Sequence, residues 1–175
     1  MLEQRIKTVI KDVPDFPKEG IVFKDITPLF LDPVLSKDMT SAFVEHARSL
    51  NTEIICGLES RGFLLGVSLA QALGIPFVLI RKAGKLPRQT RALSYDLEYG
   101  SATIEIHETD IPNGSRVLIH DDLLATGGTA KAAVELIQQV GGEIVGFSFI
   151  IELDFLNGRE KIDHYSDEIC SLVRY

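Results

Sequence analysis

The sequence predicts an α/β fold with a mainly parallel central sheet flanked by helices. Three apolar runs are typical of strands buried on both faces, and they lie at residues 54–58, 76–80 and 144–151. Segments with helical spacing of apolar residues separate these runs, and two of the helical segments end at a glycine, Gly74 and Gly141. Strands that alternate with helices in this way favour a parallel sheet.

The elements follow one another without an internal repeat or a linker, so the 175 residues are expected to form one domain, 1–175. Residues 12–33 contain four prolines and predict an irregular, turn-rich arm. The remaining predicted elements are a helix at 34–50, a strand at 54–58, a helix at 62–73, a strand at 76–80, an exposed loop at 81–100, a half-solvated edge strand at 103–107, a strand at 117–120, a helix at 129–140 and a strand at 144–151.

Composition and charge exclude several classes of protein. Hydrophobic residues make up 45% and charged residues 25% of the chain, which excludes global disorder. No apolar run approaches the roughly 20 residues that span a bilayer, and the first residues lack a secretory apolar core. The net charge of −7 argues against nucleic acid as a partner. Cys56 and Cys170 are too few for a disulfide framework, so we expect reduced thiols in a cytoplasmic protein without a membrane partner.

One short stretch is basic although the protein as a whole is acidic. It contains no acid and five cations, which are Arg81, Lys82, Lys85, Arg88 and Arg91. A basic loop of this kind is expected to bind a small anionic ligand. A solvated surface loop is equally compatible with the charges alone.

Polar residues follow the predicted strands directly: Glu59 after the first, Arg81 after the second and Asp121 after the next. Ligands of open parallel sheets bind at the carboxyl ends of the strands, so we expect these residues to lie near one another at a binding site.

Residues 121–129, Asp-Asp-Leu-Leu-Ala-Thr-Gly-Gly-Thr, carry the strongest functional signal. They begin at a strand end and open a predicted helix, where main-chain N–H groups and a helix N-terminus hold phosphate well. Glycine lets the backbone approach phosphate oxygens closely, and threonine hydroxyls add donors. The stretch is not a Walker A loop, because no Gly-Lys-Ser/Thr follows.

The paired carboxylates of Asp121 and Asp122 make the phosphate prediction more specific. Carboxylates repel phosphate, so beside a phosphate loop they need another partner, for which ribose hydroxyls or a hydrated Mg²⁺ are the natural candidates. The pattern therefore predicts a sugar phosphate with free hydroxyls. The purely structural interpretation is an N-capping Asp followed by a turn glycine.

Residues 117–129 resemble the phosphoribosyl-diphosphate (PRPP) signature of type I phosphoribosyltransferases. Further segments are similar to adenine phosphoribosyltransferases in the same order, at residues 16–17, 20–28, 57–63, 80–87, 94–100 and 158–160. The resemblance covers essentially the entire chain. Several base specificities share the PRPP signature, whereas the arm and the Leu-Glu-Tyr-Gly loop at 97–100 favour adenine.

The resemblance implies a fold and a reaction. The fold would be that of the type I phosphoribosyltransferases, with a small hood made mainly by residues 12–33 with the C-terminal segment, and a flexible loop at about 82–100. The reaction would convert adenine and PRPP to AMP and diphosphate. Mg²⁺ would be held by PRPP and water, with no direct protein ligand, and the protein would be a homodimer.

The resemblance also implies which residues hold PRPP. The 5′-phosphate would lie against Ala125, Thr126, Gly127, Gly128 and Thr129, and the ribose hydroxyls against Asp121 and Asp122. The diphosphate would lie against Glu59, Ser60, Arg61, Arg81, Lys82 and Lys85. A cis peptide is implied between Glu59 and Ser60, and Arg81 would reach the site across a dimer interface. Taken alone, Arg61 is also compatible with a surface salt bridge.

Glu98 is the proton-transfer residue that the resemblance implies. A carboxylate above the base can take or give a purine-ring proton as N9 attacks the ribose. Tyr99 beside it would orient the loop or hydrogen-bond to the departing group. Taken alone, Glu98 is equally compatible with a solvated acid.

Adenine is implied to lie against Val22, Phe23 and Lys24, with Arg159 and residues 152–155 closing the hood. Phe23 alone is also typical of a core residue. Lys24 departs from the family pattern, where arginine is frequent, and lysine lacks the planar fork of arginine. His120 stands where an apolar residue is usual, and we expect a histidine that is satisfied within the sheet.

Two other functions stay open. A phosphoribosyltransferase for hypoxanthine, guanine or xanthine would share the PRPP loop but not the Leu-Glu-Tyr-Gly loop and the arm. A PRPP-sensing transcription regulator would need a DNA-binding domain and a basic face, and this acidic chain offers no spare length for them.

Overall fold

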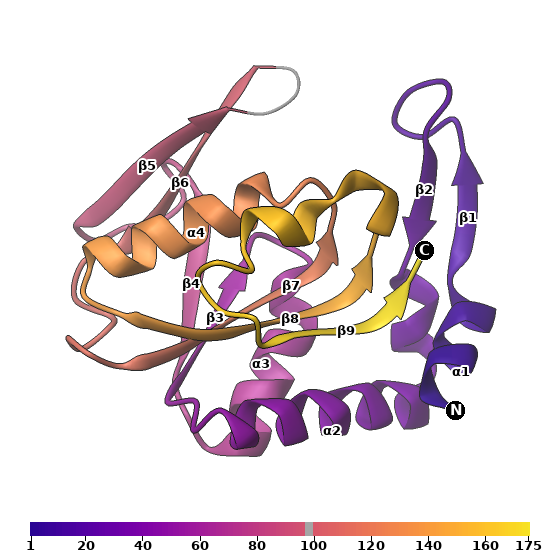
Figure 1. Ribbon diagram of the computed structural model, residues 1–175, viewed down its shortest axis with the longest axis horizontal. Coiled ribbons are helices and arrows are strands. Elements are labelled where there is room, and N and C mark those ends of the chain that lie inside the picture. The colour runs from indigo at the N-terminus through magenta and orange to yellow at the C-terminus, as the bar shows by residue number, and fades with distance from the viewer. Residues whose placement is uncertain (97–99) are drawn as a thin grey trace.

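A computed structural model describes residues 1–96 and 100–175 and contains a seven-stranded sheet with helices on both faces (Figure 1). The strand order is β5-β6-β4-β3-β7-β8-β9. In sequence order these strands are β3 (Ile54–Leu58), β4 (Phe77–Lys82), β5 (Thr90–Asp96), β6 (Ser101–His107), β7 (Arg116–Leu124), β8 (Glu143–Glu152) and β9 (Ile169–Arg174). The strands from β4 to β9 in this order are parallel, whereas β6 and β5 add an antiparallel hairpin. The predicted fold class is confirmed.

Two layers of helices bury the two faces of the sheet. The helices are α1 (Leu2–Val9), α2 (Pro33–Ser49), α3 (Gly62–Leu73) and α4 (Gly128–Gln139), with short 3-10 helices η1 (Thr27–Leu31), η2 (Asp154–Leu156) and η3 (Gly158–Lys161). Phe147 and Phe149 of β8 belong to the core on the α4 side, and Ile150 belongs to the core shared with α1, α2 and α3. Each such fully buried side chain contributes about 1.5–3 kcal/mol. The sheet is thereby fixed between the two layers.

The N-terminal arm is more regular than predicted. It forms a two-stranded antiparallel sheet of β1 (Lys11–Pro14) and β2 (Val22–Asp25), which stands beside the C-terminal end of the chain (Figure 1). The Lys24 ammonium lies 2.7 Å from the carboxylate of its cross-strand partner Asp12. The prediction of an irregular arm is wrong for these strands, because cross-strand pairs stabilise them although β1 ends on a proline.

The prediction of an exposed loop at 81–100 is wrong for residues 90–96, which form β5. Leu93 and Tyr95 are partly buried against the core on the α4 side and alternate with exposed residues, which is the period of a strand. The many charges of this segment belong to the exposed face of an edge strand.

The strand at 103–107 is not an edge strand, because β6 lies between β5 and β4. Its Glu105 is only 5% exposed, and the carboxylate accepts hydrogen bonds from the N–H groups of Lys85 and Leu86, both at 2.9 Å. The alternation of Thr103–His107 therefore reflects a buried carboxylate that accepts hydrogen bonds from the turn after β4, not a solvated face.

Neither α1 nor β9 was predicted. β9 pairs in parallel with β8 and completes the sheet at the edge opposite the hairpin. Across residues 1–96 and 100–175, every helix is too short or too polar to span a bilayer.

His120 lies on β7 with no exposed surface. Its Nδ1 lies 2.9 Å from the hydroxyl of Ser148, whereas its Nε2 has no hydrogen-bond partner in the described part of the chain. The expectation of a satisfied histidine therefore holds for one ring nitrogen and is wrong for the other. Burial lowers the pKa of His120 to about 4, so the ring is neutral near pH 7.

We expect His120 to make the protein sensitive to mild acid. Below about pH 6.5 the unfolded chain takes up a proton that the folded chain refuses until about pH 4, so stability is lost across this window as the pH falls. His120 adds at most about 1.4 kcal/mol per pH unit to the slope of the free energy of unfolding against pH. Urea unfolding at several pH values should show a shallower slope for His120→Val, whereas the exposed control His164→Asn should keep the parent slope. An unchanged slope in His120→Val would contradict the prediction.

Candidate functional site

The carboxyl ends of β4, β3 and β7 meet at one edge of the sheet, because these strands are parallel neighbours. A cleft of about 380 Å³ lies there. Eight residues line it, and they are Glu59, Ser60, Arg61, Lys82, Asp121, Asp122, Leu123 and Thr129. The structure therefore brings together the acidic pair, the turn after β3 and one lysine of the basic stretch.

The acidic pair is held from two sides. The Asp122 carboxylate is buried and lies 2.8 Å from Nε of Arg61, and Asp121 Oδ1 accepts the N–H of Asp122 at 2.8 Å. Gly62 permits this packing, because a Cβ there would lie 2.9 Å from Asp121 Oδ1. Burial raises the pKa of both carboxyl groups, the neighbouring Asp122 charge raises that of Asp121 further, and the Arg61 guanidinium partly opposes the rise. The pair thus depends on nearby cations or hydroxyl donors to stay ionised.

The turn after β3 contains a cis peptide bond between Glu59 and Ser60, as the resemblance implied. The Glu59 carboxylate accepts hydrogen bonds from the Lys82 N–H at 2.8 Å and from Nε of Arg81 at 3.2 Å. Burial alone would raise the pKa of Glu59, but these hydrogen bonds and positive charges outweigh it and lower that pKa. Glu59 therefore joins the turn after β3 to the end of β4.

The six residues implied for the diphosphate do not all face the cleft. Arg81 points to Glu59, and its Nη1 also donates to the carbonyl of Lys85 at 3.4 Å. Lys85 is exposed and lies outside the residues that line the cleft. Lys82 and Arg61 are the two cations that line it.

The predicted phosphate loop, residues 125–129, closes around a small pocket of about 80 Å³ between β7 and α4. Gly127 has a φ of +76°, which favours glycine, and it directly precedes α4. A Cβ on Gly127 would overlap the carbonyl of Gly158, and a Cβ on Gly158 would overlap the carbonyl of Ala125. The loop therefore rests directly on the backbone of η3, a contact that the sequence did not predict.

Glu152 fixes η3 in this place. Its buried carboxylate accepts from Nε of Arg159 at 2.8 Å, from Nη2 of Arg159 at 2.6 Å, from the Ser171 hydroxyl at 2.6 Å and from Arg174 at 3.0 Å. Burial alone would raise the pKa of Glu152, but these four donors lower it to about 2. One ionised carboxylate thus joins β8, β9 and the segment beneath the phosphate loop.

The arm reaches the cleft through Phe23. The Arg61 guanidinium lies 5.0 Å from the centroid of the Phe23 ring, and the Phe16 ring packs edge-on against the same ring at 5.1 Å. Val22 is 54% exposed. The Lys24 ammonium points elsewhere, to Asp12 and to a position 4.1 Å from the centroid of the Tyr175 ring.

Glu98 and Tyr99 lie outside the described residues. Two positions before this gap, the hydroxyl of Tyr95 on β5 lies 3.1 Å from Oγ1 of Thr129 in the phosphate loop. Tyr95 was not predicted as a site residue, although the alternation of residues 90–96 indicates that Leu93 and Tyr95 share the buried face of β5.

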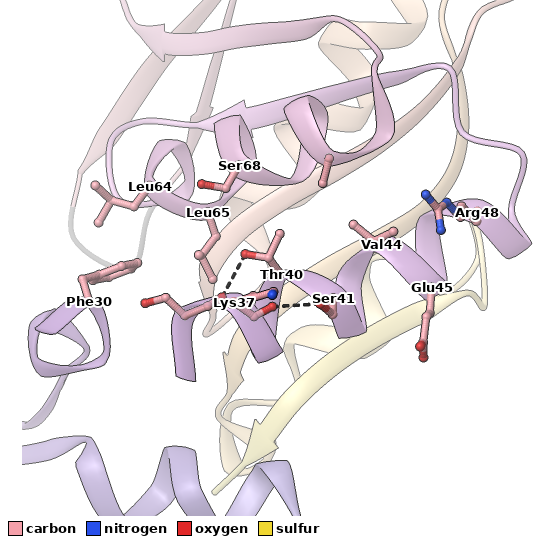
Figure 2. A pocket seen from close by; sticks show the side chains of 12 residues that line it. Phe30, Lys37, Thr40, Ser41, Val44, Glu45, Arg48, Leu64, Leu65 and Ser68 are labelled. Atoms are coloured by element: carbon pink, nitrogen blue, oxygen red, sulfur yellow. Dashed lines mark hydrogen bonds between the residues drawn. The ribbon is translucent and has the colours of Figure 1, made fainter. Parts of the chain in front are cut away.

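A larger cavity of about 650 Å³ lies away from the strand ends, between α2 and α3 (Figure 2). Two of its hydroxyl groups serve α2 itself, since Thr40 donates to the carbonyl of Ser36 at 2.9 Å and Ser41 to that of Lys37 at 3.0 Å. Leu64, Leu65 and Val44 supply much of the remaining wall. Its charged lining residues, Lys37, Glu45 and Arg48, all come from α2, whereas the cleft combines charged residues from the ends of three strands beside the predicted phosphate loop, so the cleft is the candidate site.

Comparison with known proteins identifies the family to which this chain is similar. Residues 33–173 match the family described as Phosphoribosyl transferase domain. The adenine phosphoribosyltransferase of Cytophaga hutchinsonii is 51% identical over 100% of this chain and 97% of the relative. The crystal structure of adenine phosphoribosyltransferase from Thermoanaerobacter pseudethanolicus superposes with a TM-score of 0.95 at 43% identity, covering 100% of both chains. The Saccharomyces cerevisiae enzyme, complexed with an imino-altritol bisphosphate and adenine, gives a TM-score of 0.91 at 43% identity over 98% of each chain.

We expect Glu152 to stabilise the fold as an anion. Glu152→Gln keeps the shape of the side chain but removes the negative charge that Arg159 and Arg174 share. We expect this change to lower the free energy of unfolding by about 2–3 kcal/mol near neutral pH. The pKa of Glu152 is about 2 in the folded protein and 4.5 in the unfolded chain. Its contribution to stability is therefore complete above pH 4.5 and is lost as the pH falls toward 2. Urea unfolding should therefore separate parent and variant at about pH 7 more than at about pH 3. The control Glu143→Gln, at the exposed start of the same strand, should match the parent, and a Glu152→Gln variant as stable as that control would refute the role.

Proposed function

This chain belongs to the adenine phosphoribosyltransferases within the phosphoribosyl transferase domain family, and on that premise we propose how it forms AMP and diphosphate from adenine and PRPP. One observation carries the proposal: a phosphate loop, a carboxylate pair and two turns with cations meet at a single edge of the sheet.

The 5′-phosphate binds in the loop of residues 125–129. Main-chain N–H groups at the start of α4 and the hydroxyls of Thr126 and Thr129 donate to its oxygens, and the helix dipole favours its charge. The carboxylates of Asp121 and Asp122 accept the ribose hydroxyls. A hydroxyl donor restores the hydrogen bonding that buried carboxylates need, so the sugar suits the pair better than a second anion would.

The diphosphate binds between the turns after β3 and β4. Ser60, Arg61 and Lys82 contact it, with Lys85 adding positive charge, while Glu59 orients Arg81 and the main chain of Lys82. Asp121 and Asp122 offer carboxylate oxygens, a donor type that suits Mg²⁺, and we expect the ion to be held by PRPP and water beside them. When bound, Mg²⁺ would supply positive charge beside the departing diphosphate.

Departure of diphosphate leaves positive charge on the ribose, and N9 of adenine attacks the anomeric carbon. Glu98 takes the purine-ring proton during this step and gives it back in the reverse reaction, while Tyr99 orients the loop or hydrogen-bonds to the departing group. These two roles rest on the family resemblance.

Adenine lies between Phe23 and the end of the sheet, where main-chain groups of Val22 recognise its edge. Val22 pairs with Pro14 across the two-stranded sheet, and proline has no N–H to give to the carbonyl of Val22. That carbonyl can therefore accept the exocyclic amine of adenine, while a main-chain N–H donates to ring N1.

The protein acts as a homodimer in the cytoplasm. Leu64 and Val67 on α3 are 49% and 39% exposed, and apolar side chains of this kind suit a subunit contact. The turn after β4, with Arg81, would lie at the same interface. Light scattering on the purified protein measures the oligomeric state directly.

The adenine proposal predicts strong discrimination between bases. Hypoxanthine presents O6 to the carbonyl and a protonated N1 to the N–H, and each mismatch costs about 1–3 kcal/mol. We expect kcat/KM for adenine to exceed that for hypoxanthine by about 10²–10⁴. Comparable use of hypoxanthine would defeat the proposal. Val22→Ala should retain the preference, and loss of the preference in that variant would show that the side chain, not the main chain, selects the base.

The ribose role predicts that Asp121 and Asp122 matter for PRPP and not for adenine. The double variant Asp121→Asn, Asp122→Asn should weaken PRPP binding by an amount that depends on Mg²⁺, because each lost carboxylate accepted a hydroxyl or a metal-bound water. Calorimetric titration with PRPP at several Mg²⁺ concentrations measures the affinity of the parent and of the double variant. Asp167→Asn, on the exposed surface, should bind PRPP like the parent. PRPP affinity that stays unchanged at every Mg²⁺ concentration would rule out this role.

A further inference from the structure

Tyr95 connects the β5–β6 hairpin to the phosphate loop through a single polar contact. Its ring is partly buried against the core on the α4 side, and its hydroxyl lies 3.1 Å from Oγ1 of Thr129. The hairpin approaches the same loop with its backbone, because a Cβ on Gly128 would lie 3.9 Å from the carbonyl of Asp96. Figure 1 shows the β5–β6 hairpin standing above α4, and Tyr95 and Asp96 line one pocket together with Gly128 at the start of that helix. The contact is therefore built from two elements that pack together.

Thr129 lies where the two pockets of the candidate site meet. It lines the small pocket of the phosphate loop and also the larger cleft that contains Asp121 and Asp122. A hydroxyl at this junction can reach the 5′-phosphate at the point where it continues into the ribose.

The chemistry of the two hydroxyls fixes which one should donate. A threonine hydroxyl has one hydrogen and two lone pairs, and it can point that hydrogen either to Tyr95 or into the site. A phosphate oxygen only accepts, so with phosphate bound Thr129 must donate to the ligand. Tyr95 can then donate to Thr129, and such a chain of hydrogen bonds strengthens each member.

We propose that Tyr95 is a positioning residue for the 5′-phosphate: it donates to Oγ1 of Thr129 and thereby directs the Thr129 hydrogen toward the ligand. This inference rests on the proposed function and deepens it, because it assigns a residue outside the phosphate loop to phosphate recognition. Tyr95 does not touch the ligand in this arrangement. The alternative is that Tyr95 serves only to pack the hairpin against α4.

The variant Tyr95→Phe separates the two roles, since it keeps the ring and removes only the hydroxyl. Binding constants are measured by calorimetry for AMP, ribose 5-phosphate and adenosine, with Tyr165→Phe as the control, since Tyr165 is also partly buried against the same core. Loss of one neutral hydrogen bond should weaken AMP and ribose 5-phosphate about 3- to 10-fold in Tyr95→Phe. Adenosine, which lacks the phosphate, should bind as to the parent, and Tyr165→Phe should leave all three unchanged.

A double-mutant cycle tests whether the effect passes through Thr129. In a Thr129→Val background the additional change Tyr95→Phe should leave AMP affinity unaltered, because the accepting hydroxyl is already gone. Additive losses in the cycle, equal weakening of adenosine, or unchanged AMP affinity in Tyr95→Phe would each overturn the assignment. Failure of the parent protein to bind AMP and ribose 5-phosphate would instead overturn the proposed function, and the positioning role with it. Thermal unfolding of Tyr95→Phe confirms that the compared proteins are folded.

Discussion

The parallel hydrogen bonding of β3 with both β4 and β7 is the constraint on which the site depends. Parallel neighbours end at the same edge, so the turn after β3, the end of β4 and the acidic pair of β7 meet although they are far apart in the sequence. The hydrogen bond from the Lys82 N–H to Glu59 fixes two of these ends to each other. The ion pair of Arg61 and Asp122 joins the end of β7 to the turn after β3. Side chains of both helical layers bury the strands and thus hold the edge in one geometry.

Opposite charges at this edge of the sheet compensate one another. Arg61 is paired with Asp122 and Arg81 with Glu59. A buried carboxylate without a partner is costly, so these pairs protect the fold as well as the site. Glu152 follows the same rule at greater depth, where four donors surround one carboxylate. These three carboxylates thus hold the arginines that contact them in defined positions.

Much of the fold could be predicted from the sequence, because apolar runs and glycine-terminated helical segments are local signals. The strands at 54–58 and 144–151 and the helix at 62–73 are confirmed on that basis. The errors concern polar segments whose burial depends on distant partners. From its sequence context Glu105 is expected to be solvated, whereas in the fold it is buried and accepts a hydrogen bond from the turn after β4. The charged residues near Arg91 obscure the strand-like alternation of β5 in the sequence. In the site, the strand-end residues were predictable from topology, whereas the support of Gly127 by Gly158 was not, since only the folded chain brings these glycines together.

Arg61 faces two sites at once, and this has a thermodynamic consequence. Its guanidinium is paired with Asp122 and also lies over the ring of Phe23, so the residues proposed for the sugar and for the base share one cation. A ligand that draws Arg61 away from Asp122 also changes the electrostatic face that Phe23 presents to a purine. Coupling of this kind is reciprocal: whatever factor one substrate applies to the affinity of the other is returned in equal measure. With both substrates bound as proposed, any coupling between their affinities would pass through the Arg61 side chain.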